Sequence, residues 1–294
     1  MYNKERNMIK DRNGHIAADD SKNKTLSFLY NNAVGRIIGR VLVKKWISEL
    51  GRAYMESRFS KGRIKRLIKQ HSIDMSEYEQ RDFTSFNDFF TRKIINGKRI
   101  IDEEATAVIS PADSKLTVYD ITPDGKYNIK DCEYRIDALL GGDKDLAEEF
   151  IGGKCFVYRL TVDNYHRYCY IDSGSEDSSR FIRGIYHTVN PIATEKHDVY
   201  GKNCRELTVL NTDNFGRVAY IEVGAMMVGR INNYHPKTRF NRGDEKGYFS
   251  FGGSTIVMLY KKDVVTPDGD IIENSKNGIE TIVRYGERVG AKGV

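Results

Sequence analysis

From residue 27 to about residue 70, hydrophobic side chains recur at spacings of three and four positions, which is the period of an amphipathic α-helix. Lysine and arginine fill much of the opposite face of this predicted helix, and residues 1–24 form a polar lead with turn character. A second, short and capped helix is predicted over residues 81–93, with its phenylalanines facing inward. The first third of the chain is therefore predicted to be helical.

Beyond residue 106 the pattern changes to short runs of β-branched and aromatic residues separated by Asp, Asn and Gly. Four of these runs are KLTVYDI, KCFVYRLTV, RVAYIEVGAMMVGRI and GGSTIVMLYKK, and one helical segment, residues 136–153, lies among them. Many short strands at this spacing predict an antiparallel sandwich or barrel. We therefore expect an α+β protein, with a helical, basic region over residues 1–105 and a mainly antiparallel β body over residues 106–294.

Positive charge is concentrated in the predicted N-terminal helix. Residues 36–69 contain eleven lysines and arginines and two acids, whereas the whole chain of 294 residues has a formal net charge of +6. A basic block of this kind predicts contact with an anionic surface, which is either nucleic acid or the headgroups of acidic lipids. No apolar run reaches the ~18 residues that a transmembrane helix needs, so any membrane contact is expected to be peripheral.

The four cysteines give no sign of a metal site or of a disulfide framework. They show no CxxC pair and no metal-type spacing. Scattered thiols, together with a polar N-terminus that lacks signal-peptide character, predict reduced cysteines in a cytoplasmic protein. The four are Cys132, Cys155, Cys169 and Cys204.

Two glycines and a serine, Gly252, Gly253 and Ser254, interrupt a segment that otherwise alternates like a buried strand. Glycine weakens a strand interior and usually marks a bulge or a close approach of the backbone. A serine hydroxyl becomes a nucleophile when a base removes its proton, and a carboxylate often orients that base. Asp113 in ISPADSKLTVY and His166 in TVDNYHRYCYID are the candidate partners of this serine.

Each of these residues also has a purely structural interpretation. Asp113 can be a turn or cap residue before a strand. His166 can be a hydrogen-bonded core histidine, and the glycine pair can mark a β-bulge without chemistry. Taken separately, the three segments leave both interpretations open.

The combination of segments, in contrast, resembles one known family. FTSFNDFFTRK, SPADSK, DNYHR, VGAMMVGRI and RGDEKGYF, the last leading into FGGSTIV, occur in this order along the chain. Together they resemble the phosphatidylserine decarboxylase proenzyme family, from about residue 83 to about residue 289. The Gly-Gly-Ser-Thr sequence is similar to that of a bacterial subgroup, whereas other members have Leu-Gly-Ser-Thr at this position.

The resemblance implies that the chain cuts itself between Gly253 and Ser254. The Ser254 hydroxyl attacks the Gly253 carbonyl to form an ester, and elimination then splits the chain and leaves a dehydroalanine. Hydrolysis of the dehydroalanine gives ammonia and an N-terminal pyruvoyl group, which is the covalent cofactor of the family, and no metal is implied. The implied products are a β chain of residues 1–253 and an α chain of residues 254–294. Glycines before the serine permit the crowded backbone that this attack requires.

The implied reaction converts phosphatidylserine to phosphatidylethanolamine and CO₂. The substrate amine forms a Schiff base with the pyruvoyl group at residue 254, and this organic group accepts the electrons that decarboxylation releases. In this scheme Asp113 orients His166, and His166 is the general base for Ser254. The implied partners are phosphatidylserine and the two chains of one precursor, and a homodimer is expected.

The sequence departs from the family pattern at one position. Many members have a second histidine three residues after the first, and here that position is Cys169. Either His166 is the only base, or a further histidine supports it. His187 and His235 are the candidates for such support, with structural roles as the alternative, and Cys169 itself is not expected to be a nucleophile.

A basic amphipathic helix suits an enzyme whose substrate lies in a membrane. We expect the protein to bind peripherally at the cytoplasmic face of the cell membrane, with apolar side chains in the interface and basic ones near anionic headgroups. No nucleic-acid partner is expected on this interpretation. The residues predicted to contact the membrane are Arg36, Arg40, Lys44, Lys45 and Trp46.

Three other interpretations of the sequence stay open. A serine hydrolase could use Asp113, His166 and Ser254 on an external substrate, although the chain has no G-x-S-x-G motif around this serine. A non-enzymatic module could bind nucleic acid or membrane through the basic region. A pyruvoyl enzyme could decarboxylate a free amino acid, although the basic amphipathic N-terminus favours a lipid.

Overall fold

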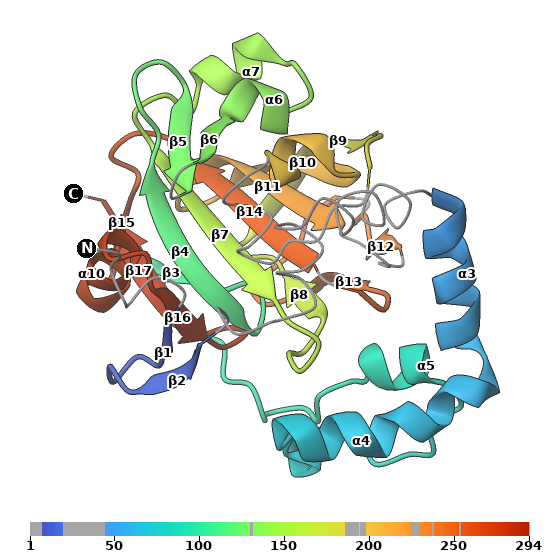
Figure 1. Ribbon diagram of the computed structural model, residues 1–294. Coiled ribbons are helices and arrows are strands. Elements are labelled where there is room, and N and C mark those ends of the chain that lie inside the picture. The colour runs from blue at the N-terminus through green and yellow to red at the C-terminus, as the bar shows by residue number, and fades with distance from the viewer. Residues whose placement is uncertain are drawn as a thin grey trace, which may run out of the picture.

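A nine-stranded sheet forms the centre of the computed structural model (Figure 1). The structure describes residues 8–19, 45–129, 132–185, 194, 198–224, 230–236, 238–252 and 254–293. From one edge to the other, the strands of the sheet are β2 (Ile16–Asp19), β1 (Met8–Lys10), β16 (Glu280–Val283), β4 (Ser114–Asp120), β7 (Lys154–Leu160), β14 (Ser254–Tyr260), β11 (Gly216–Gly224), β10 (Arg205–Thr212) and β9 (Gly174–Ile182). All neighbours are antiparallel except β1 and β16, which are parallel.

Both faces of the central strands of this sheet are buried, and most of the side chains on them are apolar. On β14, Val257 and Leu259 belong to one hydrophobic cluster, whereas Ile256 and Met258 belong to another. This alternation follows from the two-residue period of a strand. The sheet therefore separates two cores, and the predicted α+β class with a mainly antiparallel, sandwich-like body is confirmed.

Short elements cover the two faces of the sheet. On one face lie α6 (Ile136–Leu139), α7 (Lys144–Glu148), α9 (Val199–Lys202) and the pair formed by β5 (Lys126–Ile129) and β6 (Cys132–Arg135). The other face carries α10 (Gly269–Lys276) and two three-stranded sheets, which are β12 (Ile231–Asn233), β13 (Glu245–Phe249) and β8 (Arg167–Cys169), and β15 (Val265–Pro267), β17 (Arg288–Lys292) and β3 (Ala107–Ile109).

The N-terminal helices form a third hydrophobic cluster, which lies to one side of the sheet in Figure 1. The elements are α3 (Lys45–Glu56), the 3-10 turn η2 (Arg58–Lys61), α4 (Gly62–His71), the 3-10 turn η3 (Met75–Glu77) and α5 (Phe86–Phe90). Ser85 caps α5 by accepting a hydrogen bond from the Asp88 amide, and all three phenylalanines of α5 are buried. The short helix predicted within residues 81–93 is thus confirmed over residues 86–90. The longer predicted helix is helical over its described part, but it is not continuous, because Ser57 and η2 separate α3 from α4.

The first described segment differs from the sequence prediction. Instead of a polar lead to a helical region, β1 and β2 form a hairpin that extends the edge of the central sheet. Ile9 is buried against β16, and Arg12 in the turn binds Asp268 and Asp270 beside α10. A strand of three residues has too few positions to show a period, so the sequence pattern did not reveal it. None of the described helices is long and apolar enough to cross a lipid bilayer.

Candidate active site

Ser254 is the first residue of β14, in the middle of the central sheet. Its backbone pairs with Leu160 of β7 on one side and with Gly224 of β11 on the other. The side chain is fully buried, and its Oγ has no hydrogen-bond partner within the described residues. Gly252 just before it has a φ of 143°, a conformation that favours glycine, whereas Gly253 lies outside the described residues.

His166 follows the turn at the end of β7 and is also fully buried. Its Nδ1 lies 2.9 Å from the backbone carbonyl oxygen of Asn164. Because a carbonyl oxygen only accepts hydrogen bonds, Nδ1 carries the ring proton in this contact. The other ring nitrogen, Nε2, is buried and has no partner in the described part of the chain.

The surroundings of His166 favour its neutral form. Burial is the largest cause, and the nearby positive charge of Arg92 is the second; together they lower the pKa of His166 to about 3. At neutral pH the ring is therefore an uncharged imidazole. Such a ring can accept a proton at Nε2, which is what a general base for a serine hydroxyl must do.

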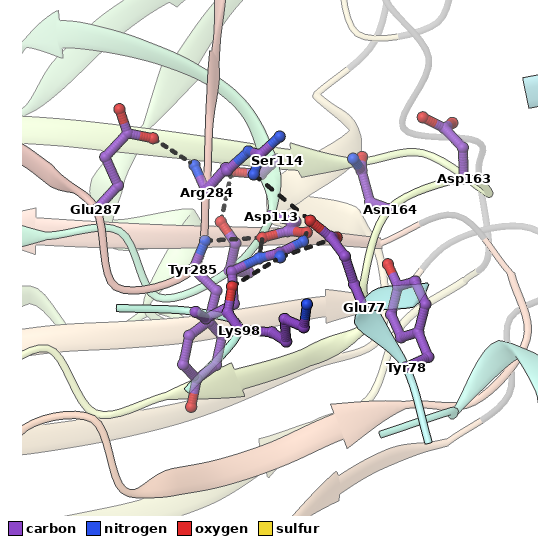
Figure 2. Close-up of polar contacts among 12 residues, drawn as sticks. Glu77, Tyr78, Lys98, Asp113, Ser114, Asp163, Asn164, Arg284, Tyr285 and Glu287 are labelled. Atoms are coloured by element: carbon purple, nitrogen blue, oxygen red, sulfur yellow. Dashed lines mark hydrogen bonds and ion pairs between the residues drawn. The ribbon is translucent and has the colours of Figure 1, made fainter. Parts of the chain in front are cut away.

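Asp113 has other partners than those expected from the sequence. Its carboxylate accepts hydrogen bonds of 2.7 and 3.2 Å from the Arg99 guanidinium and one of 2.8 Å from the Tyr285 amide. Figure 2 shows Asp113 beside Tyr285, with dashed lines for the polar contacts of its carboxylate. Among the described contacts, none links Asp113 to His166.

The Asp113 carboxylate and Nδ1 of His166 thus have separate hydrogen-bond partners. The charged fork of Arg99 binds the Asp113 carboxylate, as guanidinium and carboxylate geometries match. The backbone of Asn164 takes the position beside Nδ1 that we had expected for Asp113. The orienting role of Asp113 therefore stays a prediction, and the structure offers the Asn164 carbonyl as the group that orients His166.

Helix α5 supports both His166 and the chain before Ser254. The Phe90 ring lies on the imidazole, with 3.7 Å between the ring centroids, and Phe251 packs edge-on against Phe90 at 5.3 Å. The Phe251 amide donates a hydrogen bond of 2.7 Å to Oδ1 of Asn87. The sequence predicted that the phenylalanines of this helix face inward, and their contact with the site was missed.

The supporting residues proposed for the site lie in different places. The Cys169 thiol is buried in β8, and burial raises its pKa to about 12, which keeps it protonated and poorly nucleophilic. Both ring nitrogens of His235 face glutamates, Nδ1 at 2.8 Å from Glu176 and Nε2 at 3.2 Å from Glu206. His187 lies outside the described residues.

The predicted membrane residues fall largely outside the described chain. This holds for Arg36, Arg40 and Lys44, and for Lys45 and Trp46 only the backbone is described, as the start of α3. The adjoining surface is nevertheless apolar. Three large side chains are exposed on α3 and η2: Leu50 by 63%, Tyr54 by 41% and Phe59 by 81%.

Comparison with known proteins gave consistent matches. The family model described as phosphatidylserine decarboxylase matches residues 86–291. The chain is 49% identical over 270 residues to phosphatidylserine decarboxylase proenzyme 2 of Clostridium acetobutylicum, and the match covers 92% of each chain. It is 39% identical over 275 residues to the phosphatidylserine decarboxylase proenzyme of Clostridium perfringens, with 92% of this chain and 93% of the relative covered. The corresponding proenzyme of Clostridium tetani is 39% identical over 277 residues, with the same coverage.

Proposed function

This chain belongs to the phosphatidylserine decarboxylase family, and we propose that it is a precursor that cuts itself between residues 253 and 254 and then decarboxylates phosphatidylserine. The family resemblance that the short sequence segments suggested is confirmed, and the protein is a decarboxylase. One observation supports self-cleavage most directly: the Ser254 hydroxyl is fully buried without a hydrogen-bond partner in the described chain.

A buried hydroxyl of this kind needs an explanation. Leaving a buried polar group unpaired costs about 1–3 kcal/mol, and folded proteins contain few such groups. The His166 Nε2 is a second unpaired and buried group, and it carries a lone pair. The two atoms are not hydrogen-bonded to each other in the described structure, so the proposed proton transfer requires that they approach within hydrogen-bond reach.

The cleavage chemistry can be assigned to these two residues. Nε2 of His166 takes the hydroxyl proton while Oγ of Ser254 attacks the carbonyl carbon of residue 253, and the proton then passes to the leaving amide nitrogen. The resulting ester joins residue 253 to Oγ. Loss of the Cα proton of residue 254 breaks the Cβ–Oγ bond, which releases a carboxylate on residue 253 and leaves a dehydroalanine. Addition of water to its imine form expels ammonia and completes the pyruvoyl group.

Pyruvoyl chemistry suits the surroundings of residue 254. When present, the group supplies a carbonyl that binds the substrate amine and accepts electrons as CO₂ leaves. The protein supplies a site from which water is excluded, because the ends of β7, β11 and β14 around residue 254 are buried. His166 Nε2 can hold the proton that the product must receive.

We further propose that α3, η2 and α4 bind the membrane surface peripherally, at its cytoplasmic face. The exposed apolar side chains Leu50, Tyr54 and Phe59 lie among basic ones, and this combination suits an interfacial position. Each basic residue near an anionic surface contributes about 1 kcal/mol. The exposed basic residues of this region are Arg58, Lys61, Arg63, Lys65, Arg66 and Lys69.

Intact mass spectrometry of the purified protein beside a Ser254→Ala variant tests the proposal. The expected result is two fragments that split after residue 253, with a pyruvoyl end on the smaller one, and a single chain in the variant. Cleaved protein should release CO₂ from phosphatidylserine vesicles but not from free serine. An uncut wild-type chain that reacts at Ser254 with a serine-hydrolase probe would instead support the hydrolase interpretation.

A further inference from the structure

Arg92, two residues beyond α5, is a fully buried cation. Its guanidinium carbon lies 4.3 Å from the ring centroid of Tyr78 and 4.6 Å from that of Phe89. Among the described residues, no carboxylate lies within ion-pair distance of it, and its Nε has no hydrogen-bond partner. A buried charge without a counter-charge typically costs several kcal/mol, so its position calls for a functional reason.

The partners of Arg92 are mainly backbone carbonyls. Nη2 donates to the carbonyl oxygen of Asp163 at 3.1 Å and to that of Asn164 at 3.4 Å. The Asn164 oxygen is the same atom that accepts the hydrogen bond from Nδ1 of His166. A guanidinium and an imidazole therefore share one acceptor, whose two lone pairs allow both bonds.

This arrangement has two consequences for His166. By binding the carbonyls of residues 163 and 164, Arg92 fixes the acceptor that holds the proton on Nδ1. Its positive charge also disfavours a second proton on the ring, because two like charges repel strongly in a buried site. Either effect alone leaves the Nε2 lone pair available.

We propose that Arg92 is a positioning residue that keeps His166 neutral, with its proton on Nδ1, so that Nε2 can act as a base. The role of Nε2 as a base rests on the proposed self-cleavage, whereas the tautomer and charge of the His166 ring do not. Among the described residues, no hydrogen bond or ion pair joins Arg92 to residues 251–254, so we infer that it acts through His166 and the Asn164 carbonyl.

Other charged groups also face the ring. Lys115 of β4 disfavours the imidazolium, as Arg92 does, whereas the Asp163 carboxylate favours it. Lys115 is held by a hydrogen bond of 3.3 Å to the side chain of Asn164, and the Phe90 ring on the imidazole face is uncharged. Arg92 is the group whose charge and hydrogen bonds both act on the same ring.

The test is nitrogen NMR of ¹⁵N-histidine-labelled, uncut Ser254→Ala protein, which needs no turnover. The expected spectrum shows His166 as the neutral Nδ1–H form down to pH 5. In Arg92→Met, the midpoint of protonation should rise by about one pH unit or more, because the repelling charge is gone. In Arg92→Lys, which keeps the charge, the midpoint should stay low. His15 and His235 are internal controls whose signals should not move between variants.

Two results would overturn the proposal: an Nε2–H tautomer in the Ser254→Ala protein itself, or an unchanged His166 titration in a folded Arg92→Met protein. The first needs no Arg92 variant, so failure of Arg92→Met to fold leaves the test intact. Because the uncut protein carries no pyruvoyl group, this result is independent of the cleavage experiment. If cleavage fails while the ring behaves as expected, only the proposed function falls.

Discussion

The amide of Phe251 donates a hydrogen bond of 2.7 Å to the side-chain oxygen of Asn87, although 164 positions separate the two residues in the chain. This bond fixes the backbone three residues before Ser254 to the helix that also supports His166. The segment proposed to be cut and the histidine proposed as its base therefore share one support, α5. Sequence spacing alone gives no hint of such a connection.

Asn87→Ala should slow self-cleavage. The variant leaves the partly buried Phe251 amide without an acceptor, which costs about 1–3 kcal/mol and releases the segment before the cut. Asn87→Asp keeps an acceptor at the same place and is the matched control. The rate at which the full-length band splits after synthesis measures the effect, and equal rates in all three proteins would show that this bond has no part in cleavage.

Asp113→Asn should act mainly on stability. Asp113 and Arg99 are largely buried, and Arg99 also binds Glu77 at 2.9 Å, so Asp113→Asn leaves the guanidinium one carboxylate and should cost about 1–3 kcal/mol. We expect Arg99→Met, which leaves both carboxylates without the cation, to be more destabilising and the double variant to be less than additive. Urea unfolding of the uncut Ser254→Ala protein measures these free energies.

The same variants decide the role predicted from the sequence. If Asp113 orients His166, then Asp113→Asn should change the tautomer of the His166 ring in the nitrogen spectrum. If Asn164 does so, the tautomer should be unchanged. An Asp113→Asn protein with unchanged stability and a changed His166 tautomer would support the predicted triad of Asp113, His166 and Ser254.

Acid should destabilise the folded chain through His166. Its pKa is about 3 when folded and 6.5 when free, so the unfolded state binds the proton more tightly. Stability from this residue is complete above pH 6.5 and is lost as the pH falls from 6.5 toward about 3. At pH 5 the loss amounts to about 2 kcal/mol.

Comparison of Ser254→Ala with the Ser254→Ala, His166→Gln double variant isolates this contribution. Urea midpoints at pH 8, 6 and 5 should fall more steeply in the protein that keeps the histidine. Parallel pH dependences would mean that His166 takes up its proton as readily in the folded protein as in the unfolded one, contrary to its described surroundings.

Membrane binding is expected to depend on the exposed apolar residues of α3 and η2. Phe59→Ser and Leu50→Ser should each weaken binding to phosphatidylserine-containing vesicles by on the order of tenfold, because each side chain buries apolar area worth about 1–2 kcal/mol. Phe181→Ser is the matched control, since Phe181 is 56% exposed on β9 of the central sheet. Vesicle co-sedimentation at low and high salt measures the effect. An equal loss of vesicle binding in all three variants would contradict a specific membrane-binding surface on α3 and η2.

A deletion of the N-terminal region would be a poor substitute for these point variants. Removal of residues 1–70 would also take away β1 and β2, which belong to the central sheet. Loss of binding in such a protein would then report on folding as well as on membrane contact.

The central strands could be predicted because their residues carry the pattern themselves. β7 and β14 are apolar runs between turn residues, and α5 has a capping serine ahead of its phenylalanines. In contrast, β1 is too short to show a period, and its pairing with β16 joins opposite ends of the chain. Long-range pairing of such short strands has no local signal.

The sequence named candidate residues for the site but not their contacts, and their roles stay predictions. Ser254 and His166 were identified from their sequence surroundings, and both are buried with an unpaired side-chain atom. The group that lies within hydrogen-bond distance of Nδ1 of His166 is a backbone carbonyl, which every residue has and which no sequence pattern marks. The long side chain of Arg99 binds Asp113, and the spacing of residues along the chain does not reveal this contact either.

The strand order has a consequence for refolding of the protein, if the chain is cut as proposed. β14 lies between β7 and β11, and β16 lies between β1 and β4, so residues 254–294 are interleaved with the rest of the chain at two separate places in the sheet. An uncut chain can unfold and refold as a single molecule. Once cut, it must bring two molecules together to rebuild the sheet, and the recovered fraction depends on concentration. If the chain is cut as proposed, the uncut precursor is therefore the form that folds as a single molecule, and cleaved protein that unfolds would regain its structure only when its two chains associate again.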